Sequence, residues 1–593
     1  MKLKNIFLGL AAASIFAVSC NTFDQPAQSE YDDAVVFTSP TLTTHAINSI
    51  YDSYTVMSSY RTDWLMYYGA NTDVEVWLGT GDDERNAVDK YKMLPTNSSL
   101  DKATWQYFYG GNMQGIERAN IVISGLEKYA DLQNDKELKH LYGEALTARA
   151  LLYLDMLRYY GEVPARFEPI TAETSYLPNV NTDIIYEQLL SDLKKAADNM
   201  EYGFTTMTTH AGKACAQGIY ARIALQAAGY SLRCDDDKWN TGDPGKYALS
   251  NDANLRPEAT YQTALDGLEE AIKNSGFILE ENFSDIWLFL ARKKFDAGHE
   301  PIFQFPFSDT RGQLVYHNGV SNEKYFKTTI RKGVNPALYF KYDKDDVRRD
   351  ISCNPCKYGT DGKAAGKDIK CAAWYYGKWR SDWDTEVSYI GTDDGVKFAY
   401  LRMADMYLMA SEIANELGQT EKAINYLRPI VARAFKNNPE KVDSYMAGLT
   451  DKESIFNAIK DQRAFEFVGE FLRKGDLIRW GILKDVLDET KVDLENLKNR
   501  KGKYSGWSND VYWRYKANGI DIELFDPSSS ENPTVTDPSG GWQKKSSYFS
   551  GMDSKLYTNL YLQDPIQNMW RPIPSTIIVS NMGVLKNDFG YTF

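Results

Sequence analysis

The feature that most constrains the fold is a helical pattern that occurs three times with the same ending. Each copy is a run of small and apolar residues that stops at a glycine, namely Gly161, Gly229 and Gly418. A second helical segment follows each glycine and turns an alanine back toward the first, namely Ala196, Ala264 and Ala423. Small residues permit two antiparallel helices to approach closely, and such pairs stack into a curved scaffold. Residues 401–435 fit a tetratricopeptide unit best, so the sequence predicts a mainly α-helical protein with tetratricopeptide-like helix pairs as its scaffold.

Two long stretches lack this pattern. Residues 275–400 and 490–570 are rich in glycine, aspartate and aromatic residues, with short β-prone runs such as PIFQFPF at 301–307. Loops of this length in a compact protein usually carry function. We therefore expect a large, irregular, loop-rich face with short strands, held up by the helical scaffold.

Residues 452–481 carry charges at spacings of three or four. These are Arg463, Glu466, Glu470, Arg473, Asp476 and Arg479. Residues three and four apart are neighbours on a helix, so the spacing predicts a stripe of alternating charge on one helix that stops at Gly481. Charge stripes usually serve structure. We interpret this one as a structural ion-pair ladder, with direct ligand contact as the alternative.

The first twenty residues have the pattern of a bacterial lipoprotein signal. Lys2 and Lys4 precede an apolar run at 6–18, which ends in small residues just before Cys20. We predict a signal peptide at 1–19, followed at 20–36 by an acylated (palmitate-bearing) Cys20 and a polar tether. Ordinary secretory cleavage that leaves a free thiol is the alternative. No later run reaches 18 apolar residues, so we expect a protein anchored to a membrane without spanning it.

Composition and motifs argue against several classes of function. A net charge of −14 disfavours nucleic acid as a partner. None of the five histidines has the spacing of a helical metal site, and HExxH, G-x-S-x-G and P-loop motifs are absent from the sequence. We expect no enzyme and no cofactor. Aspartates are plentiful, however, so a carboxylate pair for glycoside hydrolysis stays open as an alternative.

The sequence does not decide the state of the cysteines or whether one acidic run binds a metal ion. Five cysteines follow Cys20, namely Cys215, Cys234, Cys353, Cys356 and Cys371. An odd number does not make a complete disulfide framework. Around Cys353, Cys356 and Cys371 the alternatives are a local disulfide, free thiols, or a zinc site that lacks a nearby fourth ligand. The run at 235–237 is a candidate for structural calcium, although it lacks EF-hand spacing and we favour a solvated acidic turn.

Three segments have the composition of a sugar-binding surface. A sugar presents an apolar CH face and a ring of hydroxyls, which suit an aromatic ring beside carboxylates, amides and arginine. Segments 64–77, 284–292 and 374–383 combine these groups. A single tryptophan is more often a core residue, but three such clusters in loop-rich surroundings favour a binding face. The predicted ligand-binding residues are Trp64, Tyr68, Asp73, Trp77, Trp287, Trp374, Tyr375 and Tyr376.

Several motifs, in their order along the chain, resemble one family. They include RALLYLDMLRYYGEVP (149–164), FAYLRMADMYLMASEIANELG (398–418), DQRAFEFVGEFLRKGDLIRWG (461–481) and WRPIPSTIIVSNMGVLKNDFGYTF (570–593). Together they resemble the SusD/RagB family of outer-membrane nutrient-binding lipoproteins of Bacteroidetes. The resemblance implies the SusD-like fold, with an N-terminal helical part at 37–280. It also implies a C-terminal SusD/RagB part at 281–593 that carries the ligand-binding loops.

The resemblance also implies a function. Members of the family are lipid-anchored on the cell surface, where they cover a SusC-like TonB-dependent transporter. They bind an oligosaccharide and deliver it to this transporter for import across the outer membrane. Asp73 and Trp77 follow the first long helix, where the family often contributes ligand contacts. A peptide-binding, RagB-like import protein is the alternative function, and a surface glycosidase is a third.

Overall fold

The structure is a computed structural model that describes residues 32–56, 59–61, 70–79, 86–98, 108–235, 237–384, 389, 391–529 and 541–591. Several predictions lie outside the described residues: the signal peptide, Cys20 and most of the tether, and the ligand residues Trp64 and Tyr68. In the described part of the chain, no helix combines the length and the apolar character needed to cross a membrane.

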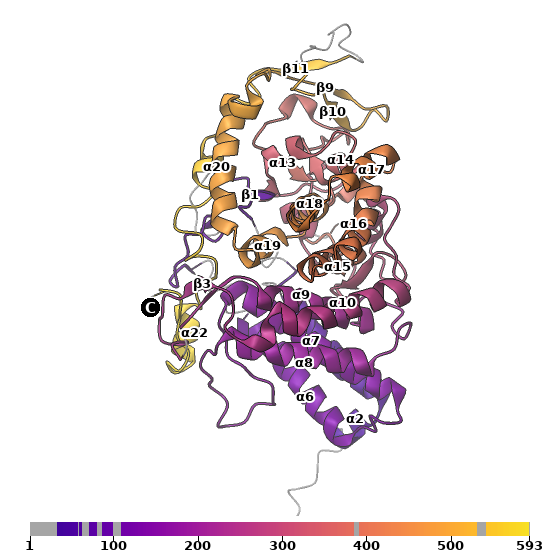
Figure 1. The fold of residues 1–593 in the computed structure, drawn as a ribbon, viewed down its shortest axis with the longest axis vertical. Helices are drawn as coiled ribbons and strands as arrows, with labels where there is room; N and C mark the ends of the chain where they lie inside the picture. Colours follow the sequence, from indigo (N-terminus) through magenta and orange to yellow (C-terminus); the bar gives the residue numbers. More distant parts are fainter. Residues whose placement is uncertain are drawn as a thin grey trace, which may run out of the picture.

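Helices of the N-terminal half form the lower part of the molecule in Figure 1. They are α2 (Asp33–Phe37), α3 (Pro40–Asp52), α6 (Gln114–Tyr129), α7 (Lys136–Tyr160), α8 (Thr182–Asn199), α9 (Lys213–Ala228) and α10 (Pro257–Asn274). From α6 to α10, each helix packs against the next. Helix α10 then packs against α15 (Met403–Glu416), which pairs with α16 (Thr420–Ala434) and α18 (Lys452–Glu466). The helical stack therefore continues across the irregular stretch between α10 and α15.

The repeated helix endings have different physical causes. Gly161 and Gly418 have φ values of +73°, in the left-handed region where glycine is favoured over L-residues. Gly229 has an ordinary φ of −82°. A Cβ there would lie 2.6 Å from Cβ of Arg479, so this glycine permits a close approach of α9 to α19 (Arg473–Arg479). All three expected alanines are fully buried between helices, and Ser411 of α15 donates to the carbonyl of Ala423 at 2.8 Å.

The upper part of Figure 1 holds the irregular face. The α-helices not yet named are α11 (Phe283–Ala291), α12 (Leu314–Asn318), α13 (Pro336–Lys341), α14 (Arg348–Ser352), α17 (Pro439–Ala447), α20 (Leu483–Asn499), α21 (Lys555–Thr558) and α22 (Ser575–Ser580). Of these, α22 lies in the lower part of Figure 1, near the C-terminus. Single turns of 3₁₀ or π helix are η2 (Ser53–Thr55), η4 (Phe108–Met113), η5 (Ala253–Leu255), η6 (Gly366–Asp368), η7 (Ser381–Trp383) and η8 (Gly502–Tyr504). The mainly helical fold with a loop-rich face is confirmed.

The strands are short and pair antiparallel. The two-stranded pairs are β1 (Glu75–Trp77) with β5 (Lys332–Val334), β2 (Ser231–Arg233) with β3 (Lys246–Ala248), β4 (Pro301–Gln304) with β8 (Ala399–Arg402), and β6 (Cys353–Asn354) with β7 (Tyr375–Tyr376). One three-stranded sheet places β9 (Val511–Tyr515) between β10 (Ile522–Leu524) and β11 (Gln543–Lys545). Strand pairing thus joins segments far apart in sequence, such as β1 and β5.

One large hydrophobic core contains residues from both predicted parts of the chain, from Phe37 to Leu585. A smaller core lies beneath α20 and the C-terminal loops. The larger core contains residues from both sides of residue 280 and so does not mark a boundary there. The division of the chain into parts at 37–280 and 281–593 stays a prediction.

The charged stretch 452–481 is not one helix. Helix α18 ends at Glu466, and the chain turns through Gly469 (φ +76°) and Phe471 (φ +59°) before α19 begins. The prediction of a continuous helix is wrong, because the apolar residues of this stretch pack in the core on both sides of the turn. Its interpretation as a structural ion-pair ladder is confirmed. The partners come mostly from other elements, as in the pairs Arg463–Asp405 (2.7 Å) and Glu466–Arg402 (2.7 Å).

The cysteines of the described chain are all free thiols. The local disulfide among Cys353, Cys356 and Cys371 that the sequence left open is therefore absent from the described residues, in which all three side chains are buried separately.

Candidate ligand-binding site

The structure corrects the expectation that the predicted aromatic rings lie on the surface. Trp77, Trp287, Trp374, Tyr375 and Tyr376 are 7%, 1%, 0%, 8% and 0% exposed. Each lies in an element whose side chains pack inward: Trp77 ends β1, Trp287 is in α11, and the other three are in or next to β7. Trp374 stacks on Tyr339 with ring centroids 4.2 Å apart. In this structure these rings cannot stack on a sugar, and they act as core residues.

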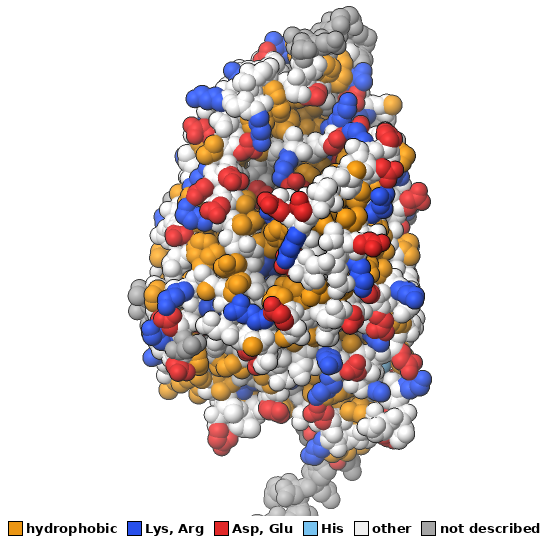
Figure 2. Space-filling model, in the orientation of Figure 1, with side chains coloured by type: hydrophobic (Ala, Val, Ile, Leu, Met, Phe, Trp, Pro, Cys, Tyr) orange, Lys and Arg blue, Asp and Glu red, His pale blue; other side chains and the backbone are white. Residues whose placement is uncertain are grey.

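Asp73 is the predicted ligand residue that lies on a cleft. This cleft, the Asp73 cleft, has a volume of about 770 Å³ and lies between α13, α18, α19 and α20. Figure 2 shows a hollow at this place, bordered by acidic and basic side chains. The carboxylate of Asp73 binds the guanidinium of Arg473 through two contacts of 2.8 and 2.7 Å. Burial opposes ionisation of Asp73, but Arg473 outweighs it and holds the pKa of Asp73 below its ordinary value.

The walls of the Asp73 cleft carry charges and aliphatic groups. Ion pairs border it, including Lys341–Asp461 (2.7 Å) and Lys503–Asp493 (2.9 Å). Its apolar lining is aliphatic, with Leu338, Ile482, Val486 and Val492 among the residues. No aromatic residue is among the described residues that line it. The cleft can therefore pair with charged and amide groups, but it offers a sugar no stacking surface.

A second pocket combines aromatic and charged groups. This pocket, the Trp383 pocket, has a volume of about 330 Å³ and lies between α13–α14, η7 and the β9–β10 hairpin. Its lining includes Tyr339, Arg349, Asp350, Tyr358, Arg380, Trp383, Lys516, Asp521 and Glu523. Trp383 is half-buried, so part of its ring is open to solvent. Gly377 permits the close approach that shapes the pocket, because a Cβ there would lie 2.3 Å from the carbonyl oxygen of Ile351.

Ion pairs fix the polar groups of the Trp383 pocket. Arg380 binds Asp382 at 2.6 Å and Asp521 at 3.2 Å, and its guanidinium lies 4.7 Å above the ring of Tyr358. Tyr358 also donates its hydroxyl hydrogen to Asp521. Burial opposes ionisation of Asp521, but Arg380 prevails and lowers the pKa of this carboxyl. The hairpin is therefore held to the pocket floor by a charged, oriented network.

Asp350 completes the polar rim. It pairs with Arg349 at 2.9 Å and with Lys516 at 3.0 Å. Burial raises the pKa of Asp350, but Arg349 and Lys516 outweigh this and lower it overall. A glycosidase needs a general acid whose pKa is raised. The shifts of Asp350 and Asp521 go the opposite way, so these carboxylates are suited to accept hydrogen bonds from hydroxyl groups and not to donate a proton.

The sequence reasoning found part of this pocket. Arg380 and Trp383 belong to segment 374–383, whose composition pointed to sugar binding. Tyr339, Tyr358 and Asp521 were missed. A signal for Asp521 was present in the run VYWRYKANGIDIEL at 511–524. Apolar and polar residues alternate there on both sides of Asn518-Gly519, which predicts a β-hairpin with Asp521 just after its turn.

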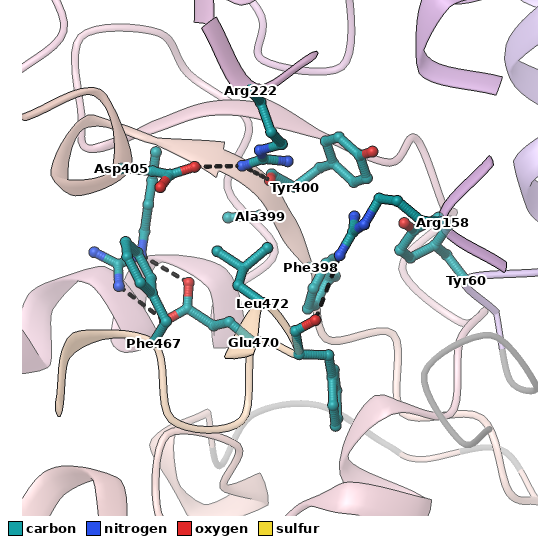
Figure 3. Close-up of a pocket in the computed structure, with 12 residues that line it drawn as sticks. Tyr60, Arg158, Arg222, Phe398, Ala399, Tyr400, Asp405, Phe467, Glu470 and Leu472 are labelled. Atoms are coloured by element: carbon teal, nitrogen blue, oxygen red, sulfur yellow. Dashed lines mark hydrogen bonds and ion pairs between the residues drawn. The ribbon is translucent and has the colours of Figure 1, made fainter. Parts of the chain in front are cut away.

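A small void lies between the N-terminal helices α7 and α9 and the later elements β8 and α15. Its lining includes Tyr60, Arg158, Arg222, Tyr400, Asp405 and Glu470, whose side chains converge in Figure 3. They come from the turn at 59–61, α7, α9, β8, α15 and the turn at 467–472, in that order. Arg222 binds Asp405 at 2.6 Å and the backbone carbonyl of Tyr400 at 3.1 Å. The void measures about 20 Å³, which is room for about one water molecule and none for a sugar.

A helical scaffold that carries a polar–aromatic pocket on an irregular face is the architecture of a ligand-binding protein. Comparison with known families identifies a family of this class. The chain belongs to the SusD/RagB family: residues 310–591 match the model of the SusD family, and residues 24–225 match the model described as "Starch-binding associating with outer membrane". The family predicted from the motifs is confirmed.

Individual relatives are distant in sequence. SusD-like protein P25 of Formosa agariphila is 24% identical over 432 residues, covering 65% of this chain and 71% of that protein. SusD-like protein P38 of the same organism is 22% identical over 413 residues, covering 65% and 73%.

Among solved structures, a SusD homolog from Bacteroides thetaiotaomicron has a TM-score of 0.69 at 17% identity, covering 94% of this chain and 98% of that one. Surface glycan-binding protein A from the same organism, in complex with laminarihexaose, has a TM-score of 0.58 at 17% identity, covering 92% and 99%. At these identities the likeness of the structures shows the fold.

Proposed function

We propose that this chain is a surface glycan-binding protein that holds an oligosaccharide in the Trp383 pocket. The observation that carries the proposal is the half-buried ring of Trp383 beside ionised, oriented carboxylates and guanidinium groups. An aromatic face can stack on the CH face of a sugar, while Asp350, Asp521 and Arg349 can hydrogen-bond its hydroxyls. The family description mentions starch binding and the outer membrane, and one structural neighbour is described in complex with laminarihexaose.

The rest of the proposal concerns where the protein acts. Cys20 is acylated and anchors the chain to the outer membrane, with the pocket exposed at the cell surface. The bound oligosaccharide passes to a SusC-like TonB-dependent transporter, and the chain itself catalyses no reaction. Support comes from the lipoprotein-like N-terminus and from the structural neighbour that is described as surface glycan-binding protein A. Co-purification of the transporter with this chain tests the partnership. Recovery of the chain without any transporter from mildly solubilised outer membranes would count against it.

Replacement of Trp383 tests the pocket. Trp383→Ala removes the stacking surface, and by analogy with bases stacked on aromatic rings we expect affinity to fall by about 1–3 kcal/mol, roughly 5- to 150-fold. Titration calorimetry against a panel of polysaccharides measures the loss. Trp239→Ala is the matched control, because Trp239 is also half-buried but does not line the pocket. Equal affinity of Trp383→Ala and the wild type would place the glycan elsewhere.

A peptide is the second candidate ligand. The Asp73 cleft favours it, because side chains of both charges and amide groups surround an aliphatic floor without aromatic rings in its described lining. The same panel, extended with mixed oligopeptides, separates the two functions. Binding of peptides with no binding of any glycan would replace the first proposal with the second.

A further inference from the structure

Three segments far apart in the sequence bring potential metal ligands together. Glu162 follows the end of α7, Cys234 follows β2, and Asp588 belongs to the C-terminal segment. Figure 1 shows β3, the partner of β2, beside the C-terminus. One carboxylate oxygen each from Glu162 and Asp588 and the sulfur of Cys234 all lie within 4.8 Å of one another. This cluster, the Glu162 cluster, lies outside the Trp383 pocket and the Asp73 cleft.

The charges of the Glu162 cluster are not balanced by protein groups. Glu162 and Asp588 are each 3% exposed. In the described part of the chain, no lysine or arginine forms an ion pair with either carboxylate. Two buried carboxylates side by side do not both stay ionised without a cation or a proton between them. Without a bound cation, a proton shared between Glu162 and Asp588 supplies this positive charge, and a divalent cation can take its place.

Backbone groups fix the orientation of one of the two carboxylates. Asp588 accepts hydrogen bonds from the N–H groups of Asn240 (2.6 Å), Thr241 (2.9 Å) and Gly242 (2.8 Å). Such outer contacts orient a ligand before the metal arrives. Glu162 has a backbone contact as well, from the N–H group of Cys234, while the thiol of Cys234 donates to its carboxylate at 3.4 Å and Asp588 faces it.

The spacing and the donor atoms favour one kind of ion. In a tetrahedral zinc site, a sulfur at about 2.3 Å and an oxygen at about 2.0 Å from the metal are roughly 3.4–3.5 Å apart. The sulfur of Cys234 and the nearest oxygen of Glu162 are 3.4 Å apart. A thiolate ligand selects zinc or a similar transition metal over calcium and magnesium, which prefer oxygen. Cys234 is half-buried, whereas Glu162 and Asp588 are buried.

We propose that Glu162, Cys234 and Asp588 bind a divalent transition-metal ion, Zn²⁺ foremost, with water as the fourth ligand. On binding, the thiol of Cys234 releases its proton to solvent and a metal–sulfur bond forms, with no change in oxidation state. The ion links the end of α7, the β2–β3 hairpin and the C-terminal segment. It would stabilise the folded chain in proportion to its occupancy.

Metal analysis and titration of the purified chain test the site. After purification without chelator, we expect about one zinc per chain by mass spectrometry. After removal by chelator, Zn²⁺ alone should raise the melting temperature. Co²⁺ should give the thiolate-to-cobalt absorption of a tetrahedral site. In Cys234→Ser this absorption should vanish, and zinc affinity should fall at least about tenfold.

Two controls keep the result specific. Cys215→Ser removes a buried thiol in α9, and Asp235→Asn removes the carboxylate next to Cys234 that pairs with Lys238 and Lys246. Both should bind zinc as the wild type does. Glu162→Gln is a second test of the site that keeps the thiol and nearly the same volume. The proposal is overturned if the wild type takes up no stoichiometric zinc, or if Cys234→Ser and Glu162→Gln respond to Zn²⁺ and Co²⁺ as the wild type does.

Discussion

The substitution Glu466→Gln tests whether the buried ion pairs hold the irregular face to the helical scaffold. Glu466 is fully buried and pairs with Arg348 (3.0 Å), Arg402 (2.7 Å) and Arg433 (2.5 Å). These arginines come from α14, β8 and α16, so one carboxylate joins three elements to α18. The arginines hold the pKa of Glu466 far below its ordinary value, against the effect of burial. Glutamine keeps the volume and removes only the charge.

The magnitude follows from the charge balance of the network. The cations are Arg348, Arg402, Arg433 and Lys378, and the anions are Asp346, Glu300, Glu466 and Glu470. All eight side chains are buried, and their formal charges cancel. Glu466→Gln leaves one uncompensated positive charge inside the protein. Breaking a buried pair by removing one partner costs about 3–5 kcal/mol, and we expect a loss of unfolding free energy in this range.

Urea unfolding followed by tryptophan fluorescence measures this loss. Lys452→Ala is the control, because its pair with Glu416 is exposed and such pairs contribute at most about 1 kcal/mol. The double variant Glu466→Gln/Arg433→Met restores the charge balance and should recover part of the stability. If Glu466→Gln is no less stable than Lys452→Ala, the network does not hold these elements together.

Two further predictions concern a buried acid and the membrane anchor. Burial raises the pKa of Glu75 from 4.5 to about 8, so the folded protein holds a proton that the unfolded chain releases. Stability contributed by this proton is complete below about pH 4.5 and is lost as pH rises toward 8, by up to about 1.4 kcal/mol per pH unit. Glu75→Gln should remove this part of the pH dependence, and unfolding free energies measured from about pH 5 to pH 8 with an unchanged slope would contradict it. Cys20→Ser should release the protein from the outer-membrane fraction, as measured by fractionation and by the loss of an acyl-modified N-terminal peptide in mass spectrometry; retention in the membrane would refute acylation of Cys20 as the anchor.

The core contains the aromatic residues that first pointed to a binding face. Trp287 packs against Trp379 with ring centroids 5.2 Å apart, and the ammonium of Lys378 lies 4.3 Å above the Trp287 ring. The same lysine pairs with Glu470 of the buried ion network. Tryptophan beside arginine and carboxylate is thus also the composition of a buried cation–π and ion-pair cluster. Composition alone could not separate this cluster from a sugar site, because both need the same side chains.

The sequence by itself determined the scaffold and the family. Helix periodicity, the glycines that end helices and the alanines that face back are local signals, because they depend on contacts within one or two helical turns. The expectation of buried small residues between paired helices therefore holds at Ala196, Ala264 and Ala423. The charge spacing of 452–481 likewise indicated structural ion pairs, although not their partners.

Only the tertiary structure decided which side chains meet and which face solvent. Tyr339, Arg380 and Asp521 belong to separate segments, and they line one pocket because the β9–β10 hairpin packs beside α13 and α14. Glu162, Cys234 and Asp588 come together in the same way, across more than 400 residues of chain. Exposure of a loop residue depends on what the rest of the chain places over it, and no local pattern records that. The sequence thus predicted a binding site on the irregular face. The packing of that face buries Trp287 and Trp374 and leaves Trp383 as the candidate residue.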